Sequence, residues 1–592
     1  MHYEGSKDPA IALKELLEKY ELSPLEINSC AADELIDFPL LSPVQCSQLI
    51  HYRSKHGALY SGKELLLIPS FCQELVDWME PYVDYSTPTK EVNRQQWSKS
   101  ITGSRWGVAE QKIPYLYSRY QSNKLDPALK LDFVAYGFPS VRRYNLLSDL
   151  QLKGGFIYRP AGRKNCSVVI GCLRASLGSN LIFRSHPIFF GGAIFERGAP
   201  KIGVDASLSS HIPLIGSAVT LNQNKWDIIL GAGVRRYALR EKLSVNDSLL
   251  FTIDPYRSAD RLEAPFKLNQ ISIFSSARQD LGKIKLRYSN AFSSFSYPGV
   301  QANASSFSCF NQSLAFSYEC RGHDLYLDLA HYKNHLALAL QLEGDLKEVI
   351  RYRVQWFSIP NGYVAPNGQI GQSGILKRPM SQVSLNLDYQ PANFHFLSYQ
   401  FQQRFFYLPR YGHLGPSHDF RHQLTWRYTG LKNIDLQFRY RYKYLSEMAF
   451  RPGVSQRIHL FKCRLAYSIS SKCLFWPEIQ LLEEEGISKS RSCLLGSTIA
   501  WKSKAMTLKV QITAGKVEDY ESRLYTYEQS LSYSFDQLVL YRDGGAAVVI
   551  AQIPVSKTCN LQLKYARYFS QDKLLQAWST EDYLAVQFIS KW

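Results

Sequence analysis

Residues 434–444 read Ile-Asp-Leu-Gln-Phe-Arg-Tyr-Arg-Tyr-Lys-Tyr and alternate strictly between apolar or aromatic and polar side chains. Successive side chains of a β-strand point to opposite faces, whereas a helix would scatter these residues around its circumference. A row that ends in three tyrosines suits the aromatic girdle of a membrane barrel. We therefore predict that one face meets lipid and the other lines a water-filled lumen. The lipid face comprises Ile434, Leu436, Phe438, Tyr440, Tyr442 and Tyr444, and the lumen face Asp435, Gln437, Arg439, Arg441 and Lys443.

The same alternation recurs along the chain, for example at 283–288, 325–329, 336–342, 383–389 and 508–512. Turn residues such as Asp543-Gly544-Gly545 separate many of these stretches, as hairpins require. No run approaches the roughly 18 apolar residues of a membrane helix. The sequence thus predicts an antiparallel transmembrane β-barrel of about 18 to 24 strands over residues 101–592. A large soluble β-sandwich or propeller is the alternative, but no propeller-like period of roughly 40 residues is present.

The final stretch carries Leu584, Val586, Phe588 and the terminal Trp592, with Ser590 interrupting the row. It resembles the carboxy-terminal assembly signal of outer-membrane barrels. The resemblance implies that the barrel-assembly machinery and outer-membrane lipid are partners and that the protein lies in the outer membrane. Residues 1–7 contain neither a basic start with an apolar core nor a cleavage site, so we expect an export signal upstream of the sequence given.

The first 84 residues show a period of three to four instead of two. Asp8 and Pro9 predict a helix start, and capping boxes begin at Ser42, Ser61 and Ser70. Gly57 and Pro81 are typical helix ends. The sequence therefore predicts a small all-α domain over residues 1–84, a linker over 85–100 and the barrel over 101–592.

Residues 25–83 resemble the tandem helix-hairpin-helix domain of bacterial competence DNA receptors. The resemblance rests on Leu25–Leu35, on Ile50-His51-Tyr52-Arg53 and on Gly57 through Leu65. It implies a periplasmic domain that binds DNA, because hairpin glycines let backbone amides approach phosphate. Where the family has those glycines, this chain has Pro39-Leu40-Leu41-Ser42 and Pro69-Ser70-Phe71-Cys72. The pairing of such a domain with a barrel resembles a group of outer-membrane proteins in Bacteroidota.

Charge separates the two parts of the chain. Residues 25–84 contain nine acidic and three basic residues, a net charge of −6, and residues 1–84 carry −8. The net charge of the whole chain is +18, so the remainder carries +26. A net-negative module is a poor partner for a polyanion, and we expect weak DNA binding from it at most.

Two functions follow from these features. In the first, the protein binds or takes up a polyanion such as DNA through a basic lumen. The candidate lumen residues are Lys283, Lys285, Arg287, Arg439, Arg441 and Lys443. In the second, it is a structural or assembly protein without DNA binding, and the acidic module docks a basic protein partner or plugs its own barrel. Large barrels also balance interior charge among their own strands, which would explain the basic residues without any ligand.

Catalytic and metal sites are not predicted. The eleven cysteines form no Cys-x-x-Cys pair and no zinc spacing. The pairs His331/His335 and His418/His422 have four-residue spacing, which places both rings on one face only in a helix. No Ser-His-Asp or paired-carboxylate arrangement is evident. We therefore expect a non-enzymatic protein without cofactor or metal.

Overall fold

The computed structural model describes most of the chain from residue 98 onward and part of the chain before it. The described residues are 20, 24–28, 30, 35, 38, 40–41, 43–68, 71, 75–76, 79–85, 98–107, 115–126, 128–137, 150–160, 165–177, 181–185, 201–206, 212–223, 225–242, 250–258, 266–296, 307–320, 322–346, 349–366, 379–392, 394–408, 416–431, 433–446, 455–470, 472–486, 489–503, 505–519, 522–531, 536–556, 558–572 and 577–591.

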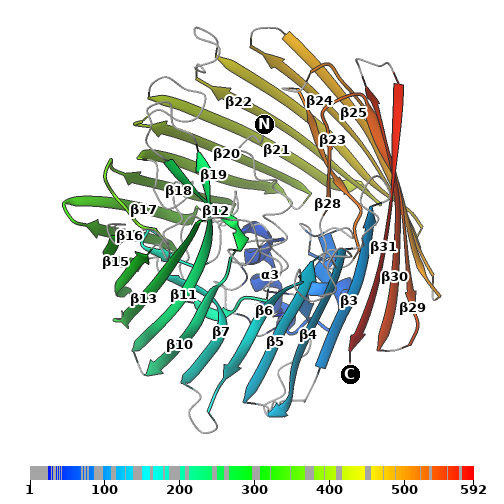
Figure 1. Ribbon diagram of the computed structural model, residues 1–592. Helices are drawn as coiled ribbons and strands as arrows, with labels where there is room; N and C mark the ends of the chain where they lie inside the picture. Colours follow the sequence, from blue (N-terminus) through cyan, green and yellow to red (C-terminus); the bar gives the residue numbers. More distant parts are fainter. Residues whose placement is uncertain are drawn as a thin grey trace.

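An antiparallel barrel dominates these residues. Within the described part of the chain, 24 strands form one closed ring, which shuts where β3 (Ser98–Gly107) pairs with β31 (Ala577–Lys591). Lys99 lies opposite Lys591 and Trp106 opposite Leu584 in that closing pair. Closure leaves no unpaired strand edge, which is what a sheet in a bilayer requires. The prediction of a large closed antiparallel barrel is confirmed, and Figure 1 shows the ring viewed close to its axis.

Between these two strands the ring runs in chain order. It contains β4 (Tyr115–Asp126), β5 (Leu129–Gly137), β6 (Leu150–Tyr158), β7 (Cys166–Leu177), β10 (Leu214–Gln223), β11 (Trp226–Lys242), β13 (Phe266–Asp280), β14 (Ile284–Ser296), β15 (Phe307–Cys320), β16 (His323–Tyr332), β17 (His335–Leu346), β18 (Ile350–Ile359), β19 (Met380–Ala392), β20 (His395–Phe406), β21 (Ser417–Leu431), β22 (Ile434–Leu445), β23 (Gln456–Ser470), β24 (Cys473–Glu485), β25 (Lys489–Lys502), β26 (Thr507–Val517), β29 (Gly544–Pro554) and β30 (Cys559–Asp572). The other strands of this region are β8 (Phe183–Arg184), β9 (Lys201–Val204), β12 (Leu250–Ser258), β27 (Leu524–Glu528) and β28 (Asp536–Leu540).

The two ends of the barrel differ. At one end the strands are joined by short turns such as 224–225, 281–283, 432–433 and 471–472. At the other end most connections are long, including 138–149, 178–213 and 518–543. Outer-membrane barrels have short turns on the periplasmic side and long loops outside. We call these the short-turn end and the long-loop end, and the barrel both begins at Ser98 and finishes at Lys591 on the short-turn end.

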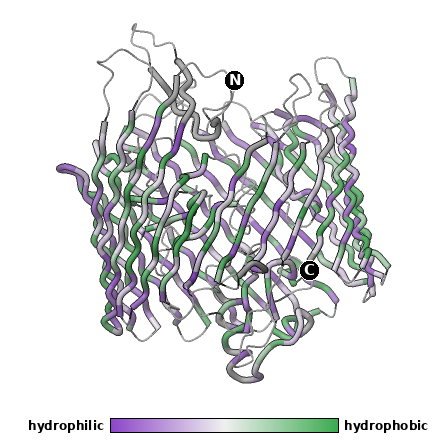
Figure 2. The backbone as a smooth tube through the Cα atoms, turned by 60° about the horizontal axis from the view of Figure 1, so that its bottom comes forward, coloured by the Kyte–Doolittle hydropathy of each residue, from purple (hydrophilic) through white to green (hydrophobic). Residues whose placement is uncertain are grey.

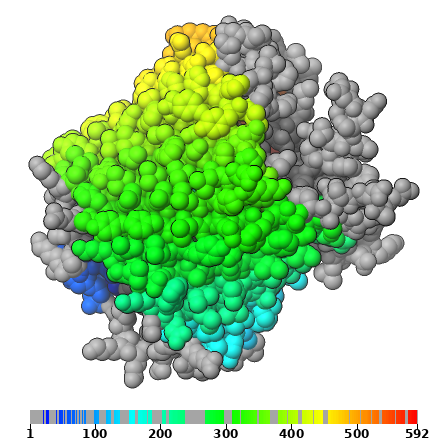
Figure 3. Space-filling view, turned by 90° about the vertical axis from the view of Figure 1, so that its left-hand side faces the viewer, coloured from blue at the N-terminus to red at the C-terminus, as the bar shows by residue number. Residues whose placement is uncertain are grey.

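Side chains alternate across the wall, as the strand repeat demands. On β14, Leu286 and Tyr288 are exposed while Arg287 between them is buried. Figure 2 shows the same alternation of hydrophobic and hydrophilic residues along neighbouring strands. In Figure 3 the colours follow the order of the sequence across one face of the barrel, as expected when each strand pairs with the next. The apolar row therefore faces outward, where a membrane barrel meets lipid.

Aromatic residues line the outer face of β20 to β22 along the length of these strands. Toward the long-loop end the rings of His418 and Tyr444 stack, with centroids 5.4 Å apart. Toward the short-turn end the rings of Trp426 and Tyr428 stack, with centroids 6.1 Å apart. Between them, Phe420 and Tyr442 are also in ring contact, at 5.7 Å.

The prediction of a small all-α domain with helix-hairpin-helix motifs is wrong. The described residues are nearly all in strands, and no helix-hairpin-helix domain is present among them. Between residues 25 and 85 the described elements are a parallel pair of short strands, β1 (Leu25–Glu26) and β2 (Val83–Asp84), the helices α3 (Pro43–His56) and α4 (Gly62–Leu65), and the 3-10 turn η1 (Glu80–Tyr82). We call the described residues from 20 to 85 the N-terminal unit.

Longer-range contacts explain the difference. The β1–β2 pairing joins the two ends of the unit, and the Asn28 side chain bonds the backbone of Leu59 and Tyr85 at 2.7 to 3.0 Å. Capping boxes and helical periodicity are local signals, and they do not encode a chain that is tied by strand pairing and side-chain-to-backbone bonds. One local signal was accurate, because α3 ends at His56 just before Gly57, which has a φ of 87°.

The structure describes only some of the residues predicted for the two hairpins. Leu41 and Phe71 are buried in the core of the N-terminal unit, and Leu40 packs against that core. Pro39, Ser42, Pro69, Ser70 and Cys72 lie outside the described residues. Buried apolar side chains at Leu41 and Phe71 support packing in place of phosphate contact.

Candidate functional site in the barrel lumen

The N-terminal unit lies at the short-turn end of the barrel. In Figure 1 its helix α3 is inside the outline of the ring. The Gln48 amide of α3 donates a hydrogen bond to the Gln390 side chain near the end of β19, at 2.5 Å. Burial raises the pKa of the Cys46 thiol on α3 to about 12, and Arg351 and Arg353 of β18 act in the opposite direction. The N-terminal unit thus lies against β18 and β19, from the middle of the chain, and covers part of the barrel opening at the short-turn end.

Segments from the long-loop end fold inward as well. Phe183 is fully buried and stacks on Phe274 of β13, with ring centroids 4.4 Å apart. The Tyr363 hydroxyl, in the connection after β18, donates to the Leu181 carbonyl at 3.2 Å. These residues belong to a buried apolar cluster that extends along the inner wall from β31 and β3 to β20.

A hairpin formed by β27 and β28 enters the lumen along the opposite arc. Its residue Glu528 forms an ion pair with Lys564 of β30 at 2.6 Å, and both side chains are at most 3% exposed. The Tyr568 hydroxyl donates to Glu528 at 2.7 Å, and the Thr526 hydroxyl donates to Glu478 of β24 at 3.0 Å. We call β27, β28 and these anchoring contacts the inserted hairpin. Buried charges are stable only when they are paired and hydrogen-bonded, so these contacts hold the inserted hairpin firmly against the wall.

The Gln511 side chain of β26 also holds the inserted hairpin, at the end of β27. The Gln511 amide on β26 donates to the Tyr527 carbonyl at 2.8 Å, and its oxygen accepts from the Gln529 backbone N–H at 2.7 Å. The amide nitrogen and the amide oxygen of Gln511 both bind backbone groups of the hairpin, as a neighbouring strand would do. The hairpin is attached to the wall through side chains of three different strands.

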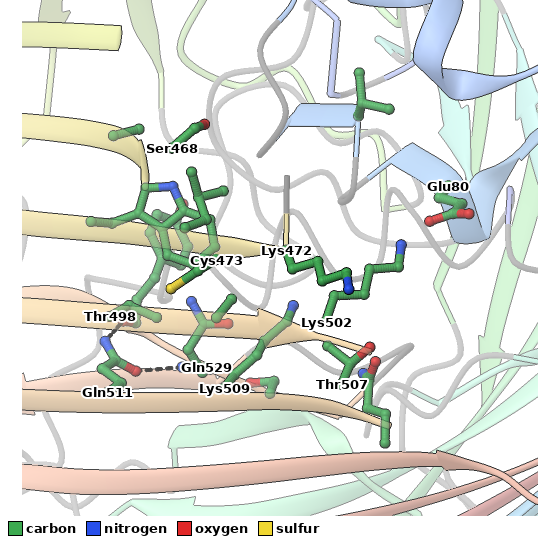
Figure 4. Close-up of a pocket in the computed structure, with 18 of the residues that line it drawn as sticks. Glu80, Ser468, Lys472, Cys473, Thr498, Lys502, Thr507, Lys509, Gln511 and Gln529 are labelled. Carbon is green, nitrogen blue, oxygen red and sulfur yellow. Dashed lines mark hydrogen bonds between the residues drawn. The ribbon is translucent and has the colours of Figure 1, made fainter. Parts of the chain in front are cut away.

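A cavity of about 1580 Å³ lies between the N-terminal unit, the inserted hairpin and the wall. The N-terminal unit contributes Gly62, Phe71 and Glu80, and the inserted hairpin contributes Thr526 through Leu531. The wall contributes residues of β21 to β26 and β29 to β31, mostly near the short-turn end. This volume exceeds the roughly 300–1,000 Å³ of common small-molecule pockets. Figure 4 shows Lys472, Lys502 and Lys509 in this cavity, with Glu80 across from them.

The basic residues predicted for the lumen are spread over two places. Lys283 is exposed in a short turn, and Lys285 and Arg287 border a void of only about 10 Å³, which holds about one water molecule. On β22, Arg439 pairs in register with Lys462, and Lys443 with Arg421. None of the six lines the large cavity, so a ligand role for them stays a prediction.

Much of the lumen charge is balanced within the wall. Arg404 forms two bonds to Asp419 at 2.8 and 2.9 Å, and Arg353 forms an ion pair with Glu343 at 2.6 Å. Arg427 and Asp435 are 2.6 Å apart on neighbouring strands. These ion pairs fit the alternative in which the barrel balances its interior charge among its own strands, without any ligand.

Sequence reasoning missed the residues that form the cavity. Glu528, Lys472 and Lys502 match no sequence motif. The available signal was weak: the connection between β26 and β29 contains two short alternating stretches, 524–528 and 536–540, inside what reads as a loop.

The remaining sequence candidates fall on the wall or beyond the described residues. The Leu584 and Phe588 side chains of the predicted assembly signal are exposed on β31, while Trp592 lies outside the described residues. His422 accepts or donates a bond with the Tyr399 hydroxyl at 2.8 Å on the outer face. In the described residues no cluster of three or more His, Cys, Asp or Glu could hold a metal ion. No helix in that part of the chain is long and apolar enough to cross a membrane.

Comparison with known proteins gives structural likeness only. No protein-family model matches the chain, and no curated protein matches it. The siderophore receptor PirA from Acinetobacter baumannii aligns with 85% of this chain and 81% of its own, at 7% identity and a TM-score of 0.43. A point mutant of the ferric enterobactin receptor PfeA from Pseudomonas aeruginosa aligns over 85% and 81%, at 9% identity and a TM-score of 0.42. The ferric yersiniabactin uptake receptor FyuA from Yersinia pestis aligns over 84% and 80%, at 9% identity and a TM-score of 0.41. Likeness this distant assigns no ligand to the chain.

Proposed function

We propose that this protein is a gated outer-membrane barrel that passes a ligand across the membrane, and that its N-terminal unit is a cap on the periplasmic mouth. The observation that carries the proposal is the large cavity bordered by the N-terminal unit, the inserted hairpin and the wall. A barrel with a purely structural role needs no such space. A ligand can enter or leave such a space when one of the elements that border it moves.

The alternative is a structural protein whose acidic N-terminal part closes its own barrel permanently. The bond between Gln48 and Gln390 favours an intramolecular role for this part over DNA binding. Its net charge of −6 also favours an intramolecular role over DNA binding, because it repels a polyanion and attracts a basic barrel. The two functions differ in one measurable respect, which is whether the cap ever leaves the mouth.

A reversible cross-link tests this difference. Gln48 and Gln390 touch through the tips of long side chains, so cysteines at both positions need a short thiol-reactive linker and not a direct disulfide. The variant Gln48→Cys/Gln390→Cys is joined by a reducible linker and studied in planar lipid bilayers. Urea, at concentrations that loosen the N-terminal unit but leave the barrel folded, should evoke conductance steps in the uncross-linked protein.

Cross-linking should abolish these steps, and a reducing agent should restore them. Each single-cysteine variant, treated identically, controls for reaction at the native cysteines. Absence of conductance in the uncross-linked protein under every condition would favour the permanently closed structural barrel. Steps that persist after complete cross-linking would show that the N-terminal unit is not the gate.

A further inference from the structure

The cavity has an excess of positive charge on its wall. Of the acids that line it, Asp435, Glu478 and Glu528 are each within 2.7 Å of a basic partner. Those partners are Arg427, Lys462 and Lys564. Glu80, the remaining acidic lining residue in the described part of the chain, belongs to the N-terminal unit across the cavity.

Lys472 and Lys502 supply this excess. Lys472 and Lys502 line the cavity with exposed side chains, and neither forms an ion pair with a described residue. The backbone holds them together, because the Lys502 N–H donates to the Lys472 carbonyl at 2.8 Å. Lys509 lies on the next strand, β26, opposite Ala500 of β25. Because Ala500 and Lys502 are two residues apart on one strand, Lys509 and Lys502 project to the same side of the wall. Like charges on neighbouring strands cost stability unless something offsets them.

The surroundings of the lysines are polar and can form hydrogen bonds. Ser468, Thr507 and Gln529 line the same cavity, and Thr507 is opposite Lys502 in strand register. Hydroxyl and amide groups both donate and accept, so they suit a ligand that carries many hydroxyls. An apolar or compact ligand would leave these groups unpaired at a cost.

We infer that the cavity binds an anionic oligosaccharide, with Lys472, Lys502 and Lys509 contacting its sulfate or carboxylate groups and the hydroxyl and amide side chains contacting its ring hydroxyls. Three positive charges over adjacent strand ends match an anion with repeated charges better than a single phosphate. The volume of about 1580 Å³ admits a chain of several sugar rings. The inference names the ligand class of the proposed passage, although the binding it predicts requires no transport.

The test is binding to the full chain in detergent micelles, measured by isothermal titration calorimetry. The probes are a sulfated glucan oligosaccharide, its unsulfated parent and inorganic tripolyphosphate. We expect the sulfated oligosaccharide to bind at least about ten-fold more tightly than either of the others. Its affinity should fall with increasing salt, because exposed charges are screened.

Two matched variants locate the site. Lys472→Gln/Lys502→Gln should weaken binding of the sulfated oligosaccharide at least about ten-fold and flatten its salt dependence. Lys225→Gln/Lys283→Gln removes the same charge from short turns of the same rim that do not line the cavity, and should change affinity less than about two-fold. Faster migration of unheated protein in a denaturing gel verifies that each variant is folded.

Two outcomes would overturn the inference, and a third would separate it from the proposed passage. Equal weakening by the two variants would mean a general effect of net charge and no site. Tripolyphosphate binding as tight as that of the sulfated oligosaccharide would refute the saccharide contacts. Tight binding without any conductance in the cross-linking experiment would support the binding site and reject the proposed passage, so the two proposals fail separately.

Discussion

At the scale of single residues, the wall of the barrel distinguishes strictly between its two faces. Tyr440 lies on the outer side of β22, where its hydroxyl bonds the His459 ring at 3.0 Å and its ring lies 4.8 Å from that of Phe461. Arg439, one residue earlier, is opposite Lys462 in the neighbouring strand. A charge is costly on the first face and already in excess on the second.

Two substitutions should therefore differ in their effect on stability. Tyr440→Arg places a charge against lipid and should lower the free energy of unfolding by about 2–4 kcal/mol if the site is near mid-membrane. Arg439→Gln should be tolerated, since it removes one of two facing positive charges. Urea unfolding in lipid, followed by tryptophan fluorescence, measures both. Equal losses would mean that the faces are assigned wrongly.

At the scale of elements, the inserted hairpin is attached by few but strong contacts. The ion pair of Glu528 with Lys564 is buried, whereas that of Glu483 with Lys489, on the strands β24 and β25, is partly exposed. Removing one partner of a buried pair leaves the other charge without compensation, and the cost is about 3–5 kcal/mol. Exposed pairs contribute little because water screens them.

Glu528→Gln should therefore displace the inserted hairpin. Arg523 precedes β27, and trypsin should cleave there many times faster in this variant than in the unmodified protein. The control Glu483→Gln should leave the cleavage rate nearly unchanged, and Glu528→Gln/Lys564→Met should restore protection because no buried charge remains. The idea that this ion pair holds the hairpin fails if Glu528→Gln remains fully protected.

At the scale of the whole molecule, charge is divided between the cap and the barrel. Residues 25–84 carry −6 while the barrel region is strongly basic. Salt shortens the range of the attraction between the cap and the barrel. The Debye length is about 10 Å at 0.1 M salt and about 3 Å at 1 M. Occupancy of the mouth by the N-terminal unit should therefore depend on salt.

The cross-linking yield between Gln48→Cys and Gln390→Cys should fall several-fold between about 0.1 M and 1 M sodium chloride, as screening loosens the cap. A cysteine pair at Ser276 and Ser289, whose hydroxyls are 2.8 Å apart on adjacent wall strands, provides a control whose yield should not change. If both yields are independent of salt, shape and apolar packing hold the cap, and the electrostatic explanation is wrong.

The sequence alone determined the wall. Alternation at 434–444 and in its repeats predicted strands, a closed antiparallel barrel and the direction of its apolar face, because a period of two is a local property of the extended chain. The same local reading failed for residues 1–84, where helix caps and periodicity predicted an all-α domain that is not present. Local signals there do not reveal the strand pairing of Leu25 with Val83.

Only the tertiary structure decided what occupies the lumen. Gln48 and Gln390 are 342 residues apart in sequence, and Tyr363 and Leu181 are 182 apart, yet each pair shares a hydrogen bond. Lys472, Lys502 and Lys509 gained a common cavity from strand register and from the position of the cap. A closed ring brings strand ends together across its interior without leaving any periodic trace in the sequence, so the wall was predictable from its residues while the cavity was not.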